Sequence, residues 1–229
     1  MSVLSHLTQT GSASILSEYE KSSIRTSITT LRTKLGYCFR NGEINNQFVF
    51  GSFDRDTILP RRKDANSDVD YMIVFNPQGY LPQTLLNQLR RFVETYYSRS
   101  EIHQSSPTIV LELGHIRFEL VPALPGSVWG IEEYLIPSPA SSYQNWTRTN
   151  PSQLKRDLNA KNTQHNSYIK PLVRILKYWN AQNGKVFSSY ELEKHVINQS
   201  ILVLQQFKRL FLYSYRKSLI MGTSRVQVN

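Results

Sequence analysis

The stretch FGSFDRDTILPRRKDANSDVDYMIVF, residues 50–75, decides how this sequence is interpreted. Its last part, VDYMIVF, has the apolar composition of a buried strand. Asp68 and Asp70 stand at the start of that strand, where side chains two residues apart point to the same side. Two carboxylates held together repel each other unless a cation lies between them. The pair therefore predicts a site for Mg²⁺, which takes carboxylate and phosphate oxygens as ligands.

A Gly-Ser pair precedes the two acids. Gly51 and Ser52 follow a short strand that we predict over residues 47–50. Glycine lets the backbone approach a phosphate closely, and free N–H groups and a hydroxyl can donate hydrogen bonds to its oxygens. A Gly-Ser turn after one strand, followed by Asp-x-Asp on the next, predicts a nucleotide-binding site. The basic residues of the loop between them are interpreted as solvent-exposed; they are Arg55, Arg61, Arg62 and Lys63.

A site that holds two metal ions for an in-line displacement at phosphorus usually contains a third acid. Glu119 lies in the otherwise apolar strand RFELV and is the favoured candidate. Glu112, in the preceding strand, is the alternative, although a solvent-facing role is the more common one for such a residue.

The remaining periodicity predicts an α+β fold in which a mixed sheet is covered by helices. Helical spacing of apolar residues indicates one long helix over residues 11–37 and another over 81–97. A tight Gly114-His115 turn joins the strands predicted over 108–113 and 116–121 into a hairpin. Asn150-Pro151 begins a helix, a further helix is predicted over 164–182 with a stop at Asn183-Gly184, and Ser188 with Glu191 forms a capping box.

Prolines at 122, 125, 137 and 139 interrupt the middle of the chain. We therefore predict a catalytic lobe over residues 1–140, which includes the long N-terminal helix, and a helical C-terminal lobe over 141–229 that completes the nucleotide cleft.

Composition is compatible with a protein that meets polyanions. The 229 residues carry a formal net charge of +10, and 40% of them are hydrophobic, as expected for a globular chain. Cys38 is the single cysteine, so an internal disulfide is excluded. No apolar run approaches the length of a membrane span, and the N-terminus lacks the order of a secretory signal, so we expect a cytoplasmic protein without a membrane partner.

The Gly-Ser turn, the Asp-Val-Asp strand and the third acid resemble the DNA polymerase β-type nucleotidyltransferase superfamily. Three segments narrow this resemblance: YLIPSPASSYQNWTRTNP, LKYWN at 176–180 and FSSYELE at 187–193. They resemble the bacterial cyclic-oligonucleotide synthases of anti-phage signalling systems, which are relatives of animal cyclic GMP–AMP synthase and oligoadenylate synthase.

The resemblance implies roles for named residues. Asp68, Asp70 and Glu119 would be the catalytic metal ligands for Mg²⁺ or Mn²⁺. The helical lobe would supply Lys177 and Ser189 to bind the donor triphosphate and Tyr190 to stack on a base. Gly51 and Ser52 would hold phosphate oxygens.

The expected activity is the joining of ribonucleoside triphosphates, ATP among them, into a cyclic di- or trinucleotide second messenger. The resemblance further implies a nucleic-acid or protein activator and a downstream effector that responds to the product. Two alternatives stay open: a nucleotidyltransferase that extends RNA or tRNA ends, and an inactive relative that binds nucleotide or RNA. This sequence departs from the family pattern in two ways that bear on these alternatives. Its third acid is Glu119, where the family usually has aspartate, and its helical region is shorter than the family's usual one.

Overall fold

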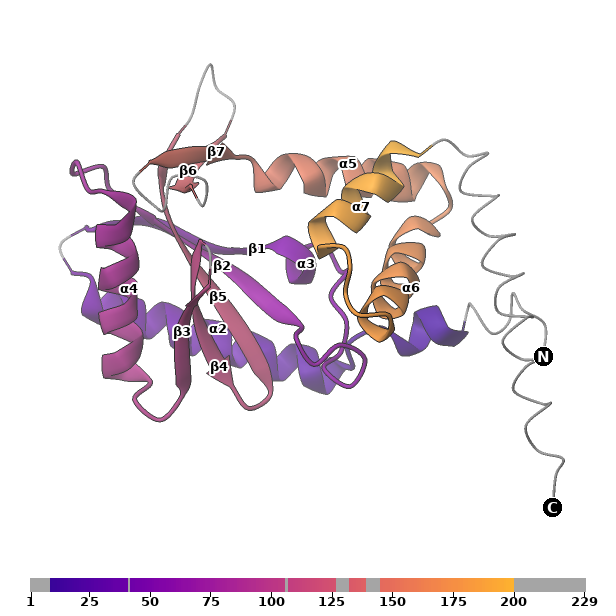
Figure 1. Ribbon diagram of the computed structural model, residues 1–229, viewed down its shortest axis with the longest axis horizontal. Coiled ribbons are helices and arrows are strands. Elements are labelled where there is room, and N and C mark those ends of the chain that lie inside the picture. Colours follow the sequence, from indigo (N-terminus) through magenta and orange to yellow (C-terminus); the bar gives the residue numbers. More distant parts are fainter. Residues whose placement is uncertain (1–8, 41, 106, 127–131, 139–144, 200–229) are drawn as a thin grey trace, which may run out of the picture.

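The computed structural model describes residues 9–40, 42–105, 107–126, 132–138 and 145–199. A mixed sheet with helices packed against it forms the first part of the chain, and three helices form the second part (Figure 1). This arrangement confirms the predicted α+β class. Among the described residues, no helix combines the length and apolar composition needed to cross a membrane. The division at residue 140 stays a prediction, and residues 200–229 lie outside the described part.

Within the described ranges the sheet has seven strands: β1 Ile44–Phe50, β2 Asp68–Phe75, β3 Glu101–Ser105, β4 Thr108–Leu113, β5 Ile116–Pro125, β6 Tyr134–Pro137 and β7 Trp146–Thr149. The central order is β1-β2-β5-β4-β3, and β6 pairs with β5 and β7. Strands β2 and β5 run parallel, whereas the other pairs are antiparallel. The predicted hairpin is β4–β5, with its turn at Gly114-His115. Strands β3, β6 and β7 were not predicted from the sequence.

Two helices, α2 Glu18–Cys38 and α4 Pro82–Tyr96, pack on one face of the sheet. Alternation along β2 decides which residues face them. Val69, Tyr71, Ile73 and Phe75 join the core formed with these helices, while Met72 and Val74 pack in a separate cluster on the other side. Since side chains alternate along a strand, Asp68 and Asp70 project to the face away from α2 and α4.

The predicted N-terminal helix over 11–37 is wrong in its first part. Helical residues from 9 to 13 are separated from α2 by a break, and α2 begins only after Ser17. The Ser17 hydroxyl accepts a hydrogen bond from the Glu20 backbone N–H, and the Glu20 carboxylate accepts one from the Ser17 N–H. This reciprocal capping box starts a new helix, and the sequence signal for it, Ser-x-x-Glu, was present but overlooked. Tyr19, assigned to the apolar face, is 83% exposed.

The helical part contains α5 Pro151–Gln164, α6 Ile169–Gln182 and α7 Ser189–Asn198. The start at Asn150-Pro151 and the capping box of Ser188 are confirmed. The helix predicted from residue 164 begins instead at Ile169, because Asn166 and Ser167 adopt positive φ and reverse the chain after α5. Gly51-Ser52, predicted as a turn, forms the first residues of a short helix, α3 Gly51–Asp54.

Candidate active site

Register between β2 and β5 brings the predicted acids together. Asp70 lies opposite Glu119 and Asp68 lies opposite Arg117 in the parallel pair. Adjacent residues in neighbouring strands project to the same face of a sheet, so all three carboxylates lie on the face away from α2 and α4. The sequence indicated the two aspartates on one strand, but only the sheet order places Glu119 beside them.

Gly51 approaches the Asp70 carboxylate more closely than any other residue type could. Its φ is +71°, and a Cβ atom placed on it would lie 1.7 Å from Asp70 Oδ2. A side chain at this position would therefore collide with the acid as well as strain the backbone. The loop that follows turns back at once, since the N–H groups of Thr57 and Ile58 both donate to the Ser52 carbonyl, at 2.9 and 3.1 Å. These contacts hold the Gly51-Ser52 pair against the start of β2.

The surroundings of Asp68, Asp70 and Glu119 disfavour the ionised form of all three carboxylates when no cation is bound. Burial, and then the neighbouring carboxylates of Asp68 and Glu119, raise the pKa of Asp70 to about 8. Burial, followed by the charge of Asp68, raises the pKa of Glu119 to about 7. The pKa of Asp68 is also raised by burial, against the attraction of Lys185 and Lys177. A bound cation would relieve this repulsion and favour the ionised carboxylates.

The donor set fits a divalent metal ion of the magnesium type. All three groups are carboxylates, the hard oxygen ligands that Mg²⁺ and Mn²⁺ accept. Among the described residues, no group of three or more His, Cys, Asp or Glu side chains is arranged so that it could hold a metal ion by itself, these three acids included. Magnesium commonly binds through one or two carboxylates together with substrate phosphates, so a closed protein cage is not required.

Glu112, the alternative third acid, is occupied elsewhere. Its two carboxylate oxygens accept hydrogen bonds from Arg61 and Arg117, and the Arg117 contact is 2.8 Å long. Burial alone would raise its pKa, but the two guanidinium groups outweigh that effect and lower it. Arg61, interpreted from the sequence as solvent-exposed, is instead half-buried in this ion pair. The geometry thus favours Glu119 over Glu112.

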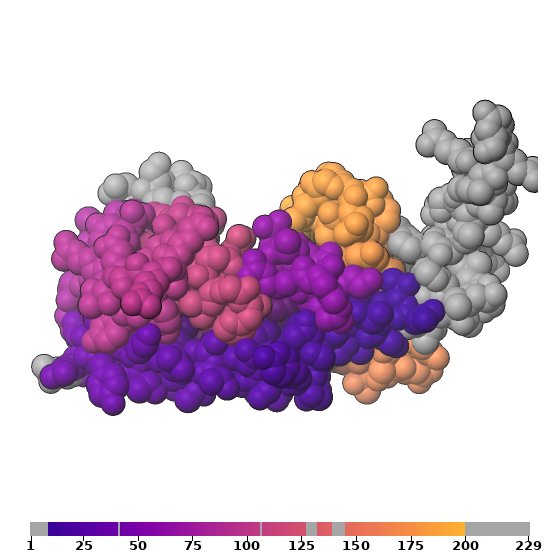
Figure 2. Space-filling view, turned by 90° about the horizontal axis from the view of Figure 1, so that it is seen from below, coloured from indigo at the N-terminus to yellow at the C-terminus, as the bar shows by residue number. Residues whose placement is uncertain are grey.

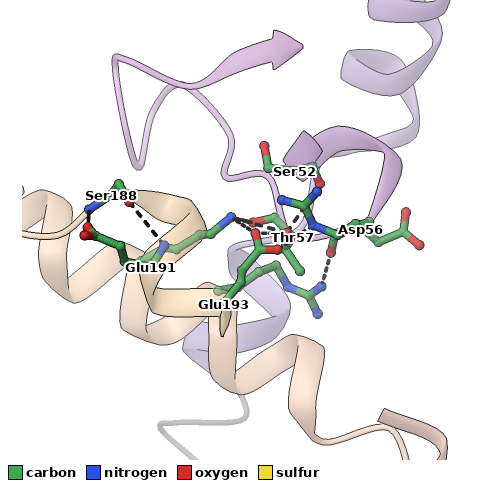
Figure 3. A network of polar contacts seen from close by, with 9 residues as sticks. Ser52, Asp56, Thr57, Ser188, Glu191 and Glu193 are labelled. Atoms are coloured by element: carbon green, nitrogen blue, oxygen red, sulfur yellow. Dashed lines mark hydrogen bonds and ion pairs between the residues drawn. The ribbon is translucent and has the colours of Figure 1, made fainter. Parts of the chain in front are cut away.

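A buried polar network joins the loop after α3 to the helical part of the chain (Figure 3). Glu193 of α7 is fully buried and accepts hydrogen bonds from Arg55 Nε at 2.5 Å and from Thr57 Oγ1 at 2.6 Å. Lys177 of α6 also donates to Glu193 and lies 3.2 Å from Thr57 Oγ1. Burial alone would raise the pKa of Glu193, but Lys177 and Arg55 hold it below its ordinary value.

Sequence reasoning missed three members of this network: Arg55, Thr57 and Glu193. Arg55 was interpreted as a solvated loop residue, but it is only 6% exposed. A signal for Glu193 did exist, because it precedes the buried Val196 by three residues and so shares its helical face.

The predicted nucleotide-binding residues of the helical part lie in different surroundings. Lys177 is buried and is close enough to Asp68 and Asp70 to favour their ionised forms. Ser189 opens α7 and is half-buried, whereas Tyr190 is 53% exposed. The ring of Tyr190 is therefore not part of the core, and Lys194 Nζ lies 5.7 Å from the ring centre. Its exposed face is available for stacking.

Comparison with known proteins gives matches at the level of sequence and of fold. Residues 1–162 match the family described as the Second Messenger Oligonucleotide or Dinucleotide Synthetase domain. A probable cyclic nucleotide synthase of Bacillus cereus strain VD146 is 28% identical over 209 residues. That alignment covers 76% of this chain but 59% of the relative, so the chain spans less than two thirds of the relative's length.

Solved structures of low identity share the fold. The c-UMP-AMP synthase CdnE of Rhodothermus marinus superposes with a TM-score of 0.65 at 17% identity, covering 85% of this chain and 75% of that one. The c-di-GMP synthase CdnE of Capnocytophaga granulosa has a TM-score of 0.66 at 17% identity, with coverage of 95% and 69%. The cyclic dinucleotide synthase CdnE of Elizabethkingia meningoseptica has a TM-score of 0.60 at 21% identity, with coverage of 76% and 68%.

Proposed function

Because this chain belongs to the family of Second Messenger Oligonucleotide or Dinucleotide Synthetase domains, we propose that it joins ribonucleoside triphosphates into a cyclic di- or trinucleotide. The observation that carries the proposal is the alignment of Asp70 with Glu119, next to a glycine at which any side chain would collide with the Asp70 carboxylate. This arrangement combines a cation site with a backbone segment suited to phosphate.

In this proposal Asp68, Asp70 and Glu119 hold Mg²⁺, or Mn²⁺ in its place. The ion would neutralise phosphate charge and favour attack at the α-phosphorus. Gly51 and Ser52 present backbone N–H groups and a hydroxyl to the triphosphate. Lys177 supplies positive charge, Ser189 adds a hydroxyl, and Tyr190 stacks on a base.

The chemical step is a displacement at phosphorus. The 2′- or 3′-hydroxyl oxygen of one nucleotide forms a bond to the α-phosphorus of the other, and the bond to pyrophosphate breaks. Glu119 accepts the hydroxyl proton, since a carboxylate within reach of the reacting hydroxyl can act as a general base. A second attack within the linear intermediate closes the ring. Holding the intermediate makes that step intramolecular, an advantage that can reach about 7–11 kcal/mol.

The biological setting is part of the same proposal. Relatives named as cyclic nucleotide synthases suggest that the product is a second messenger, and we place its use in anti-phage signalling. The enzyme would act in the cytoplasm, respond to a nucleic-acid or protein activator, and signal to an effector that binds the product.

One incubation tests the proposal. The protein is mixed with the four labelled ribonucleoside triphosphates and Mg²⁺ or Mn²⁺, with and without an RNA primer, and the products are treated with phosphatase. We expect a small labelled product that resists phosphatase and forms without primer, because a ring has no terminal phosphate. Asp68→Ala with Asp70→Ala should abolish it, while Glu43→Ala, an acid outside the site, should leave it unchanged.

Two other outcomes would reject the proposal. Label found solely on the RNA primer, at lengths that grow with time and fall with salt, would indicate an RNA-extending enzyme. Binding of nucleotide without release of pyrophosphate under either metal would indicate the inactive relative.

A further inference from the structure

A pocket lies apart from the acids, at the junction of the N-terminal helices with α3 and α6. Its volume is about 470 Å³, within the range of small-molecule sites. Its apolar lining comes from Ile15, Leu16, Val49, Phe53 and Ile58. Asp68, Asp70 and Glu119 do not line it.

The pocket spans two parts of the chain that are distant in sequence. A Cβ atom on Gly11 would lie 3.4 Å from Ile175 of α6, so the N-terminal residues touch the helical part directly. Figure 2 shows these N-terminal residues, in indigo, next to the salmon surface of the α5–α6 region. Pockets at such junctions are common binding sites, because a ligand there contacts both sides.

The charged side chains that line the pocket leave an excess of positive charge. Its two acids already have lysine partners outside the pocket: Asp54 pairs with Lys155 at 2.7 Å and Asp56 with Lys170 at 3.3 Å. Lys21, which also lines the pocket, pairs with Glu18 at 2.7 Å. Arg25 and Arg174 have no ion pair within 4 Å in the part of the chain that the structure describes, although Glu18 attracts Arg25 and Asp56 attracts Arg174 from further away.

Arg174 is the more unusual of the two arginines. Its side chain is 7% exposed, and one terminal nitrogen donates to the Asp56 carbonyl at 2.7 Å. Its Nε is buried and has no hydrogen-bond partner among the described residues. A buried donor without a partner is destabilising, and an acceptor on a ligand in the pocket would satisfy it. Arg25 reaches the same pocket from the exposed side of α2.

We propose that this pocket binds a small organic anion, in which an apolar body packs on the aliphatic and aromatic lining and a phosphate or carboxylate group is held by Arg174 and Arg25. Guanidinium groups suit both kinds of anion, since they offer paired donors in a planar fork. The ligand would contact α3, which carries Gly51 and Ser52, and α6, which carries Lys177. If the proposed function holds, it would thereby adjust the nucleotide site from a distance.

Binding is tested with a matched pair of fluorescent probes, a measurement that does not depend on catalysis. The anionic probe is 8-anilinonaphthalene-1-sulfonate, and N-phenyl-1-naphthylamine is its neutral counterpart. We expect one equivalent of the anionic probe to bind, and more tightly than the neutral one. Arg25→Glu should weaken the anionic probe by about tenfold or more, since it reverses a charge beside the sulfonate, and should spare the neutral probe. Arg25→Lys should restore most of the affinity.

The matched control is Arg91→Glu, which makes the same charge change at an exposed position on α4. It should leave both probes unaffected. Because Arg25 and Arg91 are both exposed, neither change should unfold the protein, and thermal unfolding verifies this. Excess ATP should not displace the anionic probe, because the proposed site is separate from the nucleotide site.

Displacement of the bound probe distinguishes the two classes of anion. 1-Naphthyl phosphate, 1-naphthoate and neutral 1-naphthol are compared as competitors. Stronger displacement by the phosphate assigns a phosphate ester as the ligand class, and stronger displacement by the carboxylate assigns a carboxylic acid. Equal displacement by neutral 1-naphthol, insensitivity to Arg25→Glu, or competitive loss of the probe to ATP would each overturn the proposal.

Discussion

Gly51→Ala is the substitution whose effect can be worked out most fully from the structure. Alanine would bring two separate penalties. The φ of +71° lies in the left-handed region, and the new Cβ would lie 1.7 Å from Asp70 Oδ2 and 2.5 Å from Asp70 Cγ. Ordinary contacts of a Cβ atom are 3.4–4 Å long, so the carboxylate would have to move by more than an ångström.

The two penalties have different sizes. A left-handed backbone costs an L-residue about 1–2 kcal/mol. Forcing an extra carbon into a packed site costs typically about 1–3 kcal/mol. We therefore expect Gly51→Ala to lower the free energy of unfolding by about 2–5 kcal/mol. The rate of pyrophosphate release should fall more severely than the free energy of unfolding, because the displaced group, the Asp70 carboxylate, is one of the proposed metal ligands.

Urea unfolding measures the first effect, with Gly79→Ala as the matched control. Gly79 also has positive φ, +73°, but a Cβ there would meet no atom within 4 Å. The control should therefore show the backbone penalty alone, about 1–2 kcal/mol. Pyrophosphate release under saturating nucleotide measures the second effect, and only Gly51→Ala should impair it.

A double-mutant cycle isolates the collision. With Asp70→Ala, the closest remaining contact of the new carbon would be the residue-70 Cβ at 2.9 Å. Since 2.9 Å is still shorter than an ordinary Cβ contact, Gly51→Ala should then cost less than it does in the wild-type background but still more than the control does. Equal stability losses for Gly51→Ala and Gly79→Ala in the wild-type background would refute the reasoning, because they would mean that Asp70 does not press against this glycine.

Four other outcomes are expected. The pKa of Asp70 rises from 3.8 to about 8 on folding, so the stability that this group contributes is complete below about pH 4 and is lost as pH rises toward 8. The free energy of unfolding, measured in EDTA, should therefore fall over that pH range. It should fall less for Asp70→Asn. Glu193→Gln should lower the free energy of unfolding by about 3–5 kcal/mol, measured in urea, because it leaves two buried cations without their anion; a loss below about 1 kcal/mol would contradict this. Glu119→Gln should abolish nucleotide incorporation while Glu112→Gln retains it, and the reverse result would move the third ligand to Glu112. Tyr190→Phe should preserve nucleotide affinity and Tyr190→Ala should weaken it by about 1–3 kcal/mol, whereas equal losses would indicate a role for the hydroxyl.

The sequence by itself determined the local features of this protein. The apolar strand at residues 69–75, the hairpin at Gly114 and the helix starts at Pro151 and Ser189 were all predicted, because each depends on residues close together in the chain. The pairing of Asp68 with Asp70 was equally visible, since a strand places alternate residues on one side.

Apolar spacing gave wrong helix boundaries at two places. There the helix is interrupted or starts late because of an N-terminal cap or a reversal of the backbone, although the helical spacing of apolar residues continues. Ser17 divides the first predicted helix, and the reversal at Asn166 and Ser167 delays the start of the helix predicted over 164–182 until Ile169. The short strands β3, β6 and β7 were missed because their pairing partners, rather than their own composition, stabilise them.

Only the tertiary structure decided which acid joins the aspartates and which basic residues are buried. The sequence favoured Glu119 and kept Glu112 as the alternative; the parallel pairing of β2 with β5 places Glu119 beside Asp70, while Glu112 pairs with two arginines. Arg55 looked like a solvated loop residue until α7 supplied Glu193 from 138 positions away. The physical reason is that burial and charge pairing depend on neighbours in space, and a single sequence records only neighbours along the chain.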